Sequence, residues 1–342
     1  MRKRWPLRIS VAVLIGLHLV VLLAGFISPY NPTAQDRENP YAPPSRIHFI
    51  DSRGSFHVRP FVYAWTSDPA NFIDYEEDLS NPLPIRFLVH GDSYELAGLI
   101  SSNLHFFGID AGNRVALAGT DAFGRDVFSR TLYGGVVSLS AGLVATALTL
   151  ILAVLIGTTS GYWGGWLDEF LMRFAELFLL LPWLYLLLAL RAFLPLSMNP
   201  VQMFFLIVVV IGSVGWARPA RLVRGVVLSA RERNYVLAAR GFGASHWHIL
   251  RHHVLPETYP VLLTQASLLI PQFVLAEVTL SFFGLGLSEP LPSWGSLLAS
   301  LQQYSVIVSH WWMFVPGGAL VIYCLAYFAV ADSLQARLKS GH

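Results

Sequence analysis

Long apolar stretches separated by polar connections dominate the 342-residue chain. A helix needs about 20 apolar residues to cross the hydrocarbon core of a bilayer. Six stretches reach or approach this length: Ile9–Ser28, Val136–Thr159, Phe174–Leu196, Gln202–Ala217, Val261–Leu285 and Trp312–Ala331. The first exceeds the apolar part of a signal peptide and no clear cleavage site follows it, so we expect an uncleaved anchor. The pattern predicts an all-α polytopic membrane protein with about six transmembrane helices.

A polar connection of over a hundred residues, about Pro29–Gly135, separates the first two apolar stretches. It is too long for a plain loop. Within it, two β-rich runs flank Asp51–Gly54, which predicts a hairpin, and the runs PIRFLVHG and RVALAG are candidate strands. Pro40, Pro43 and Pro44 mark a tether. We therefore expect a small, partly β, folded lobe outside the membrane, between the first and second helices.

The distribution of charge predicts the orientation of the chain. Only 13% of residues are charged and 54% are hydrophobic, whereas a soluble domain is about a quarter charged. With the N-terminus inside, 14 of the 23 lysines and arginines lie on the inner side, seven of them between Arg218 and Arg251. Because inner loops are rich in lysine and arginine, we expect both termini to be cytoplasmic. The expected domains are residues 1–28 (N-terminus and first helix), 29–135 (outer lobe and interfacial segment) and 136–342 (five-helix core with a cytoplasmic loop at 218–258).

Motifs for catalysis and for nucleotide binding are absent from the sequence. No G-x-x-x-x-G-K-[ST] occurs, and the two lysines, Lys3 and Lys339, are terminal, which excludes a Walker-type phosphate loop. Neither G-x-S-x-G nor H-E-x-x-H is present. His248 and His252 share a helix face, as metal ligands can, but their charged neighbours are mostly arginines, which favours solvated polar residues over a metal site. We expect no catalytic residue and no bound metal.

The segment YVLAARGFGASHWHILRHHVLPE, Tyr235–Glu257, lies between two strongly apolar stretches. It predicts two short helices joined at Gly243, with Ser245 as the N-cap of the second. Pro256 is placed to stop or redirect that helix. One interpretation is a projecting segment whose small alanines let another surface approach closely; the other is a basic inner loop that only fixes topology.

This segment resembles the cytoplasmic signature loop of ABC-importer permeases, E-A-A-x(3)-G-x(9)-I-x-L-P. The matching positions are Ala238, Ala239, Gly243, Leu255 and Pro256. Leu237 replaces the glutamate and His253 replaces the isoleucine. Two further stretches, GTDAFGRDVFSRTLYGG and AEVTLSFFGLGLSEPLPSWG, are similar to the dipeptide/oligopeptide branch of binding-protein-dependent transport inner-membrane components. The resemblance covers about Gly119–Leu338, together with the first helix by position.

The resemblance implies a type I ABC importer permease fold in a bacterial inner membrane. Such a chain is a non-catalytic subunit that forms half of a translocation path for a peptide-like solute. Its loop contacts a separate ATP-binding subunit, which holds ATP and magnesium, so no cofactor is bound directly. The implied partners are this ATPase, a second permease subunit (identical or different), an extracytoplasmic solute-binding protein and the lipid bilayer; no nucleic acid is implied. In place of the family glutamate, Arg240 or Arg233 is a candidate for a compensating polar contact.

Glu277 is an acid within the fifth apolar stretch. Acids in a membrane helix are costly and face a bundle interior or an aqueous path. Gln272 and Ser281, five residues before and four after, are placed to satisfy it. Two interpretations stay open, in which these residues line the translocation path or Glu277 fixes helix packing.

Charges alternate in sign just before the second apolar stretch, at Asp121, Arg125, Asp126 and Arg130. Asp126 and Arg130 are four apart and can pair on a helix. They predict either an interfacial helix held by ion pairs or a docking contact for a delivered binding protein.

Two other classes of protein remain as alternatives. An ion-gradient-driven secondary transporter predicts several intramembrane acids or an inverted pair of broken helices. A membrane-anchored extracytoplasmic binding or sensor protein predicts that the outer lobe is active by itself.

Overall fold

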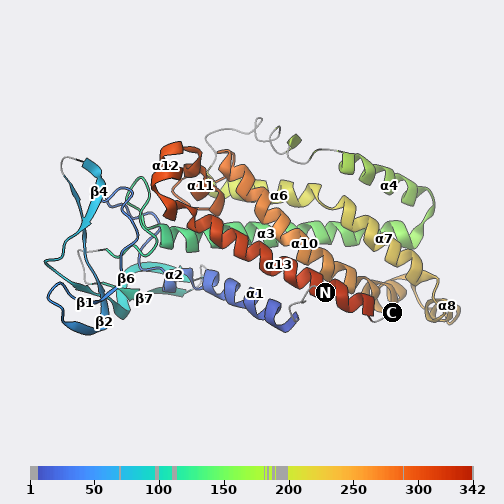
Figure 1. Ribbon diagram of the computed structural model, residues 1–342. Coiled ribbons are helices and arrows are strands. Elements are labelled where there is room, and N and C mark those ends of the chain that lie inside the picture. Colours follow the sequence, from blue (N-terminus) through green and yellow to red (C-terminus); the bar gives the residue numbers. More distant parts are fainter. Residues whose placement is uncertain are drawn as a thin grey trace. The chain divides into compact units, whose positions relative to one another are not determined.

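The computed structural model describes residues 7–68, 71–96, 100–109, 114–180, 182, 185–186, 189, 199–287 and 289–340 (Figure 1). The chain forms two compact units. Unit 1 comprises Met1–Ala12, Leu139–Leu280 and Cys324–His342, and unit 2 comprises Val13–Ser138 and Ser281–Tyr323. Most of the described chain is helical, and the strands are confined to residues 48–108.

In the part of the chain that the structure describes, three continuous helices are long and apolar enough to cross a membrane. They are Val127–Trp163, His246–Phe282 and Trp311–Ala336. A fourth span results if Val201–Val214 and Ala217–Arg231, bent by 43°, are counted together. The apolar helix α1 (Leu7–Leu22) is shorter, and the predicted span Phe174–Leu196 runs into residues 181–198, which lie mostly outside the described part. Three or four of the six predicted spans are therefore present as candidates among the described residues.

The helices of unit 1 include the segment that the signature motif singles out. They are α4 (Gly165–Leu180), α6 (Pro200–Val214), α7 (Ala217–Arg231), α8 (Asn234–Gly241), α9 (His246–Ile249), the π-helical turn η1 (Leu250–Val254) and most of α10 (Leu255–Phe282). Asn199 caps α6, because its side chain accepts a hydrogen bond from the Val201 N–H, and Pro200 occupies the first turn. Gly215 ends α6 at the bend.

The helix α3 (Val127–Trp163) is longer than the apolar pattern indicates. Its beginning is fixed by Asp126, whose Oδ2 accepts hydrogen bonds from the Ser129 N–H and hydroxyl at 2.8 and 2.5 Å. It ends where Gly164 adopts φ +67°, a left-handed conformation that terminates helices. Both signals are polar or conformational, so hydropathy alone places the ends too far inward.

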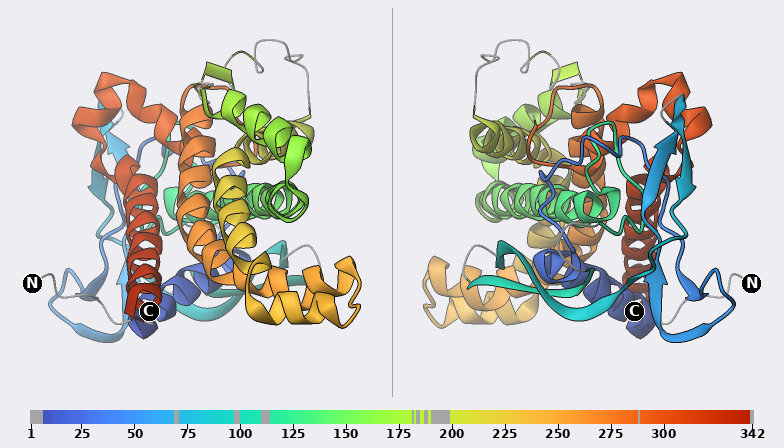
Figure 2. Two further views of the ribbon diagram at one scale, coloured as in Figure 1. Left: turned by 90° about the vertical axis from the view of Figure 1, so that its right-hand side faces the viewer. Right: turned by 90° about the vertical axis from the view of Figure 1, so that its left-hand side faces the viewer.

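The described residues of unit 2 include seven strands in three small sheets. They are β1 (His48–Ile50), β2 (Phe56–Val62), β3 (Trp65–Asp68), β4 (Asn71–Glu77), β5 (Leu83–Pro84), β6 (Arg86–Leu96) and β7 (Ile100–Gly108). The sheet orders are β1-β2-β5, β3-β4 and β6-β7, and all pairs are antiparallel. Strands β6 and β7 form a long curved ribbon (Figure 2). The remaining short helices of this unit are α2 (Ala24–Ile27), α11 (Trp294–Ala299), η2 (Ser300–Gln302), α12 (Tyr304–Ser309) and η3 (Trp311–Phe314), which leads into α13 (Val315–Ser340).

The predicted hairpin at Asp51–Gly54 is confirmed. His48 pairs with Phe61, and Gly54 turns the chain at φ +82°. PIRFLVHG contributes β5 and β6, also as predicted. RVALAG, residues 114–119, is not a strand. Its Val115 is fully buried in the apolar cluster formed with Val62 and Phe107, so its apolar residues pack as a loop.

Candidate functional site

The signature segment contains a short helix, α8, and the beginning of a second helix, joined at Gly243 as the sequence predicts. Gly243 lies between α8 and α9 at φ +83°, which favours a residue without a Cβ. Ser245 caps α9 by accepting a hydrogen bond from the His248 N–H. The segment follows directly on α7 (Figure 1; Figure 2).

Pro256 does not stop the second helix, which is one of the two roles that the sequence predicts for this proline. The helix runs without a break from His246 to Phe282. Just before the proline, the π-helical turn Leu250–Val254 bonds the Leu255 N–H to the Leu250 carbonyl oxygen, five residues back. This wider turn gives room to a ring that in a regular α-helix would clash with the preceding turn.

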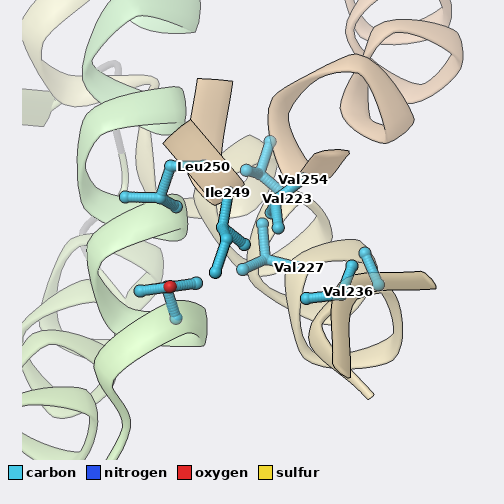
Figure 3. Packing of buried hydrophobic residues seen from close by; sticks show 8 residues of the cluster. Val223, Val227, Val236, Ile249, Leu250 and Val254 are labelled. Carbon is cyan, nitrogen blue, oxygen red and sulfur yellow. The ribbon is translucent and has the colours of Figure 1, made fainter. Parts of the chain in front are cut away.

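A buried apolar cluster holds the segment to α7 (Figure 3). Val223 and Val227 come from α7, Val236 from α8 and Ile249 from α9. The full set is Tyr162, Val223, Val227, Ala230, Val236, Ile249, Leu250 and Val254. Five members are fully shielded from solvent, namely Val223, Val227, Val236, Ile249 and Val254. The segment is therefore packed as part of unit 1.

The opposite face of the segment carries large exposed apolar side chains. Phe242 is 92% exposed, Trp247 68% and Leu237 46%. Ala238 is exposed beside them, and Ala239 is half-buried against the apolar cluster. Exposed apolar groups gathered on one short segment are typical of an interaction surface. We call Leu237, Phe242 and Trp247 the exposed apolar face.

The other matching positions of the motif lie at the join to α10. His253 and Leu255 are half-buried, and Pro256 is exposed. Nearby, Glu257 accepts an ion-pair contact from Arg233 at 3.0 Å and a hydrogen bond from the Tyr235 hydroxyl at 2.9 Å.

Of the two arginines proposed to compensate for Leu237, only one is available. Arg233 is engaged with Glu257. Arg240 is exposed and has no ion-pair partner among the residues that the structure describes. Arg240 is therefore the better candidate for a polar contact with a partner.

The histidines of the segment contact each other and α3. His248 and His252 stack with ring centroids 4.4 Å apart. His246 Nδ1 lies 2.9 Å from the Tyr162 hydroxyl. Within the described ranges, no group of three or more His, Cys, Asp or Glu residues is arranged to hold a metal ion.

The residues proposed for the translocation path have different surroundings. Gln272 is exposed and lines a cavity of about 680 Å³ in unit 1. Glu277 is 1% exposed and does not line this cavity, and Ser281 is 3% exposed. The burial of Glu277 favours the packing interpretation of this acid.

Four charged side chains of unit 2 form a compact cluster. Arg125 contacts Asp121 at 2.7 Å and Glu289 at 2.7 Å. Arg130 contacts Glu289 at 2.9 Å and Asp121 at 3.5 Å. We call Asp121, Arg125, Arg130 and Glu289 the charged quartet; its two positive and two negative charges balance.

The predicted pair of Asp126 with Arg130 is not formed. Asp126 caps α3, and its other oxygen, Oδ1, has no hydrogen-bond partner among the described residues. Arg130 turns instead to Glu289, a residue that the sequence analysis did not single out. Arg125 and Arg130 thus bind a loop from a distant part of the sequence, and the alternating charges do not form ion pairs along one helix face.

Burial raises the pKa of the Asp126 carboxyl from 3.8 to about 6, and its hydrogen bonds with Ser129 and the charge of Arg114 oppose the rise. Because the folded pKa is the higher one, the folded state binds the proton more tightly, and this group's contribution to stability falls as pH rises from about 4 to about 6. The loss amounts to about 3 kcal/mol.

Asp126→Asn is therefore expected to raise the apparent Tm at pH 7 and to leave it nearly unchanged at pH 4, because the amide mimics the neutral acid. Thermal unfolding of the purified chain, followed across pH 4 to 8, measures this. Glu169→Gln, which alters an exposed pair on α4, is the control. Parallel curves of Tm against pH for wild type and Asp126→Asn would contradict the prediction.

The chain also matches known proteins. The family model described as "Binding-protein-dependent transport system inner membrane component" matches residues 128–340. The chain belongs to this family. It is the permease subunit of an ABC importer. The family consists of membrane components, so the prediction of a non-catalytic subunit is confirmed.

Two curated relatives and one solved structure illustrate the similarity. The dipeptide transport system permease protein DppC of Bacillus subtilis is 36% identical over 64% of this chain and 67% of its own length. The probable D,D-dipeptide transport system permease protein DdpC of Escherichia coli is 37% identical over 65% of this chain and 73% of its own. A crystal structure of an amino acid ABC transporter with histidines is 17% identical over 62% of this chain and 94% of that chain, with a TM-score of 0.45.

The family match establishes the kind of transport system and the membrane to which the permease belongs. A binding-protein-dependent ABC system includes an ATPase and a solute-binding protein, and its permease is a multi-pass protein of the inner membrane. The match begins at residue 128, so all seven strands precede it.

The sequence analysis did not predict one ion pair of unit 1. Asp168 of α4 receives two hydrogen bonds from Arg224 of α7, at 2.5 and 2.6 Å, and one from the Ser160 hydroxyl. The Arg224 hydrogen bond holds the pKa of Asp168 below its usual value. An acid in the polar connection between the second and third apolar stretches is a sequence signal, but it does not identify the partner residue.

Proposed function

We propose that this permease carries a peptide-like solute and that residues 218–258 couple it to the ATPase. The exposed apolar face carries this proposal. Leu237, Phe242 and Trp247 are exposed on a segment whose inner face is fully packed, so the surface is presented in a fixed geometry. The two dipeptide permeases described above support a peptide as the solute.

Coupling follows from the way the segment is anchored. Val236 and Ile249 are buried against Val223 and Val227 of α7, and α9 continues into α10. A displacement of the segment by its partner is therefore transmitted to α7 and α10, because packed interiors move as rigid bodies. ATP and magnesium act in the partner subunit, and the permease converts closure of the ATPases into alternating access.

The wider assembly extends this proposal. A second permease subunit, identical or related, completes the translocation path. The arginines of residues 218–251 support a cytoplasmic location for this region and for both termini. The domains are residues 1–28, 29–135 and 136–342, with the outer lobe facing the binding protein.

The charged side chains at the beginning of α3 and just before it act in this scheme by holding the outer loops. Asp121, Arg125, Asp126 and Arg130 are each 7% exposed or less, so a delivered binding protein has little access to them. The contacts of Arg125 and Arg130 with Glu289 fix the shape of the surface on which a binding protein docks.

Gly243→Pro is expected to abolish co-purification of the ATPase and ATP-dependent uptake. Proline requires φ near −65°, whereas Gly243 has φ +83°. Gly243→Asn is the matched control, since asparagine tolerates the left-handed region and a Cβ at this position meets no atom within 4 Å.

The measurement is affinity purification from native membranes, with mass spectrometry of the proteins that accompany each variant. Wild type and Gly243→Asn should retain an ATP-binding subunit and a second permease. If the wild-type chain brings down no ATPase in several mild detergents, the coupling role of this segment is refuted.

A further inference from the structure

The cavity in unit 1 is built by three parts of the chain. Its walls are Phe178 and Leu179 of α4, the bend between α6 and α7, and residues of α10 that include Leu269 and Phe273. At the bend, Gly215 allows α10 to come close: a Cβ there would lie 2.7 Å from the ring of Phe273. The volume, about 680 Å³, is that of a typical small-molecule site.

The charges that line this cavity are all positive. Arg218 and Arg221 lie in the first turns of α7, and the exposed amide of Gln272 faces the same space. No acidic residue is among the described residues that line it, and neither arginine has an ion-pair partner in the described part of the chain. By contrast, the next arginine on the helix, Arg224, is neutralised by Asp168.

Such a lining favours an anion with an apolar body. A guanidinium binds a carboxylate through two parallel hydrogen bonds, and such charge-assisted bonds are the strong ones. The apolar walls, among them Phe178, Ile211 and Phe273, suit the remainder of the ligand.

We infer that this cavity is a solute subsite in which Arg218 and Arg221 bind the C-terminal carboxylate of a transported peptide. The inference rests on the proposed function, because it takes the solute to be a peptide. It also connects the solute to the coupling segment: Val223 and Val227, which anchor that segment, follow Arg221 on the same helix. Binding at one end of α7 and docking at the other are then linked, and by thermodynamic necessity the linkage is reciprocal.

The test uses protection of a cysteine placed in the cavity. The only native cysteine, Cys324, is replaced by serine, and Leu222, a 44% exposed lining residue, is replaced by cysteine. The importer complex is purified in nanodiscs, and the rate of maleimide labelling is measured with trialanine or with trialanine amide. We expect trialanine to slow labelling, and the amide, which lacks the carboxylate, to require an about ten-fold higher concentration.

The arginine variants make the test specific. Arg218→Gln with Arg221→Gln should raise the half-protecting concentration of trialanine about ten-fold. Arg173→Gln, an exposed arginine of α4 that does not line the cavity, should leave it unchanged. Labelling of Trp166→Cys, at a 78% exposed position outside the cavity, should not respond to either peptide.

Equal protection by trialanine and its amide, or full protection in the double glutamine variant, would overturn the inference. The inference would also be overturned if the double glutamine variant changed the amount of retained anionic lipid, measured by native mass spectrometry, without changing the protection by trialanine. ATP-dependent uptake by the same complex separates the two proposals. If trialanine does not protect Leu222→Cys in the chain that keeps both arginines, although peptide uptake is intact, only the subsite is refuted. Absence of peptide uptake by the wild type refutes the proposed function.

Discussion

Replacing Phe242 and Trp247 together by serine is expected to abolish ATP-dependent uptake while leaving the apparent Tm of the isolated chain unchanged. Both side chains are largely exposed, so their removal costs the folded chain little. In a complex, a few aromatic anchors supply most of the binding energy. We therefore expect the amount of co-purified ATPase to fall at least about ten-fold.

The control is Trp166→Ser, which removes an exposed tryptophan of α4 outside the coupling segment. It should retain the ATPase and uptake. If the double variant of Phe242 and Trp247 still binds ATPase as wild type does, the exposed apolar face is not the docking surface.

Asp121→Ala is expected to destabilise unit 2 by about 3–5 kcal/mol and to prevent accumulation of the folded permease. Asp121 contacts the buried guanidinium groups of Arg125 and Arg130. Its other oxygen, Oδ1, accepts hydrogen bonds from the Phe123 and Arg125 N–H groups. Alanine removes all of these and leaves two arginines, 8% and 1% exposed in their side chains, with Glu289 alone.

Two milder variants of the charged quartet calibrate this expectation. Asp121→Asn keeps an oxygen for the turn and should cost less than alanine. Glu289→Gln should cost less than about 1 kcal/mol, because the Glu289 side chain is 53% exposed and solvent screens its contacts. Membrane-fraction yield and thermal unfolding in detergent measure the series. Equal stability of Asp121→Ala and wild type would show that the quartet does not hold this region together.

The sequence by itself determined the features whose causes are local. The hairpin at Asp51–Gly54 depends on a turn of a few residues, and the N-cap at Ser245 depends on an N–H three residues on. Gly243 needs a left-handed backbone because of its position between two helices. The apolar stretches also came from the sequence, since hydropathy follows from composition. The family followed from the same motif, because its spacing sets a local geometry.

Only the tertiary structure decided which distant groups meet. Glu289 binds Arg125 from 164 positions away, and Asp168 selects Arg224 from 56 away, although several other arginines were available. Charge fixes the kind of partner, but packing of helices fixes its identity. The carboxylate subsite is of the same type: its wall residues lie on α4, α7 and α10, and no spacing along the chain brings Arg221 to Phe273. The length of α3 and the loop at 114–119 likewise depended on a cap and a buried cluster that hydropathy does not contain.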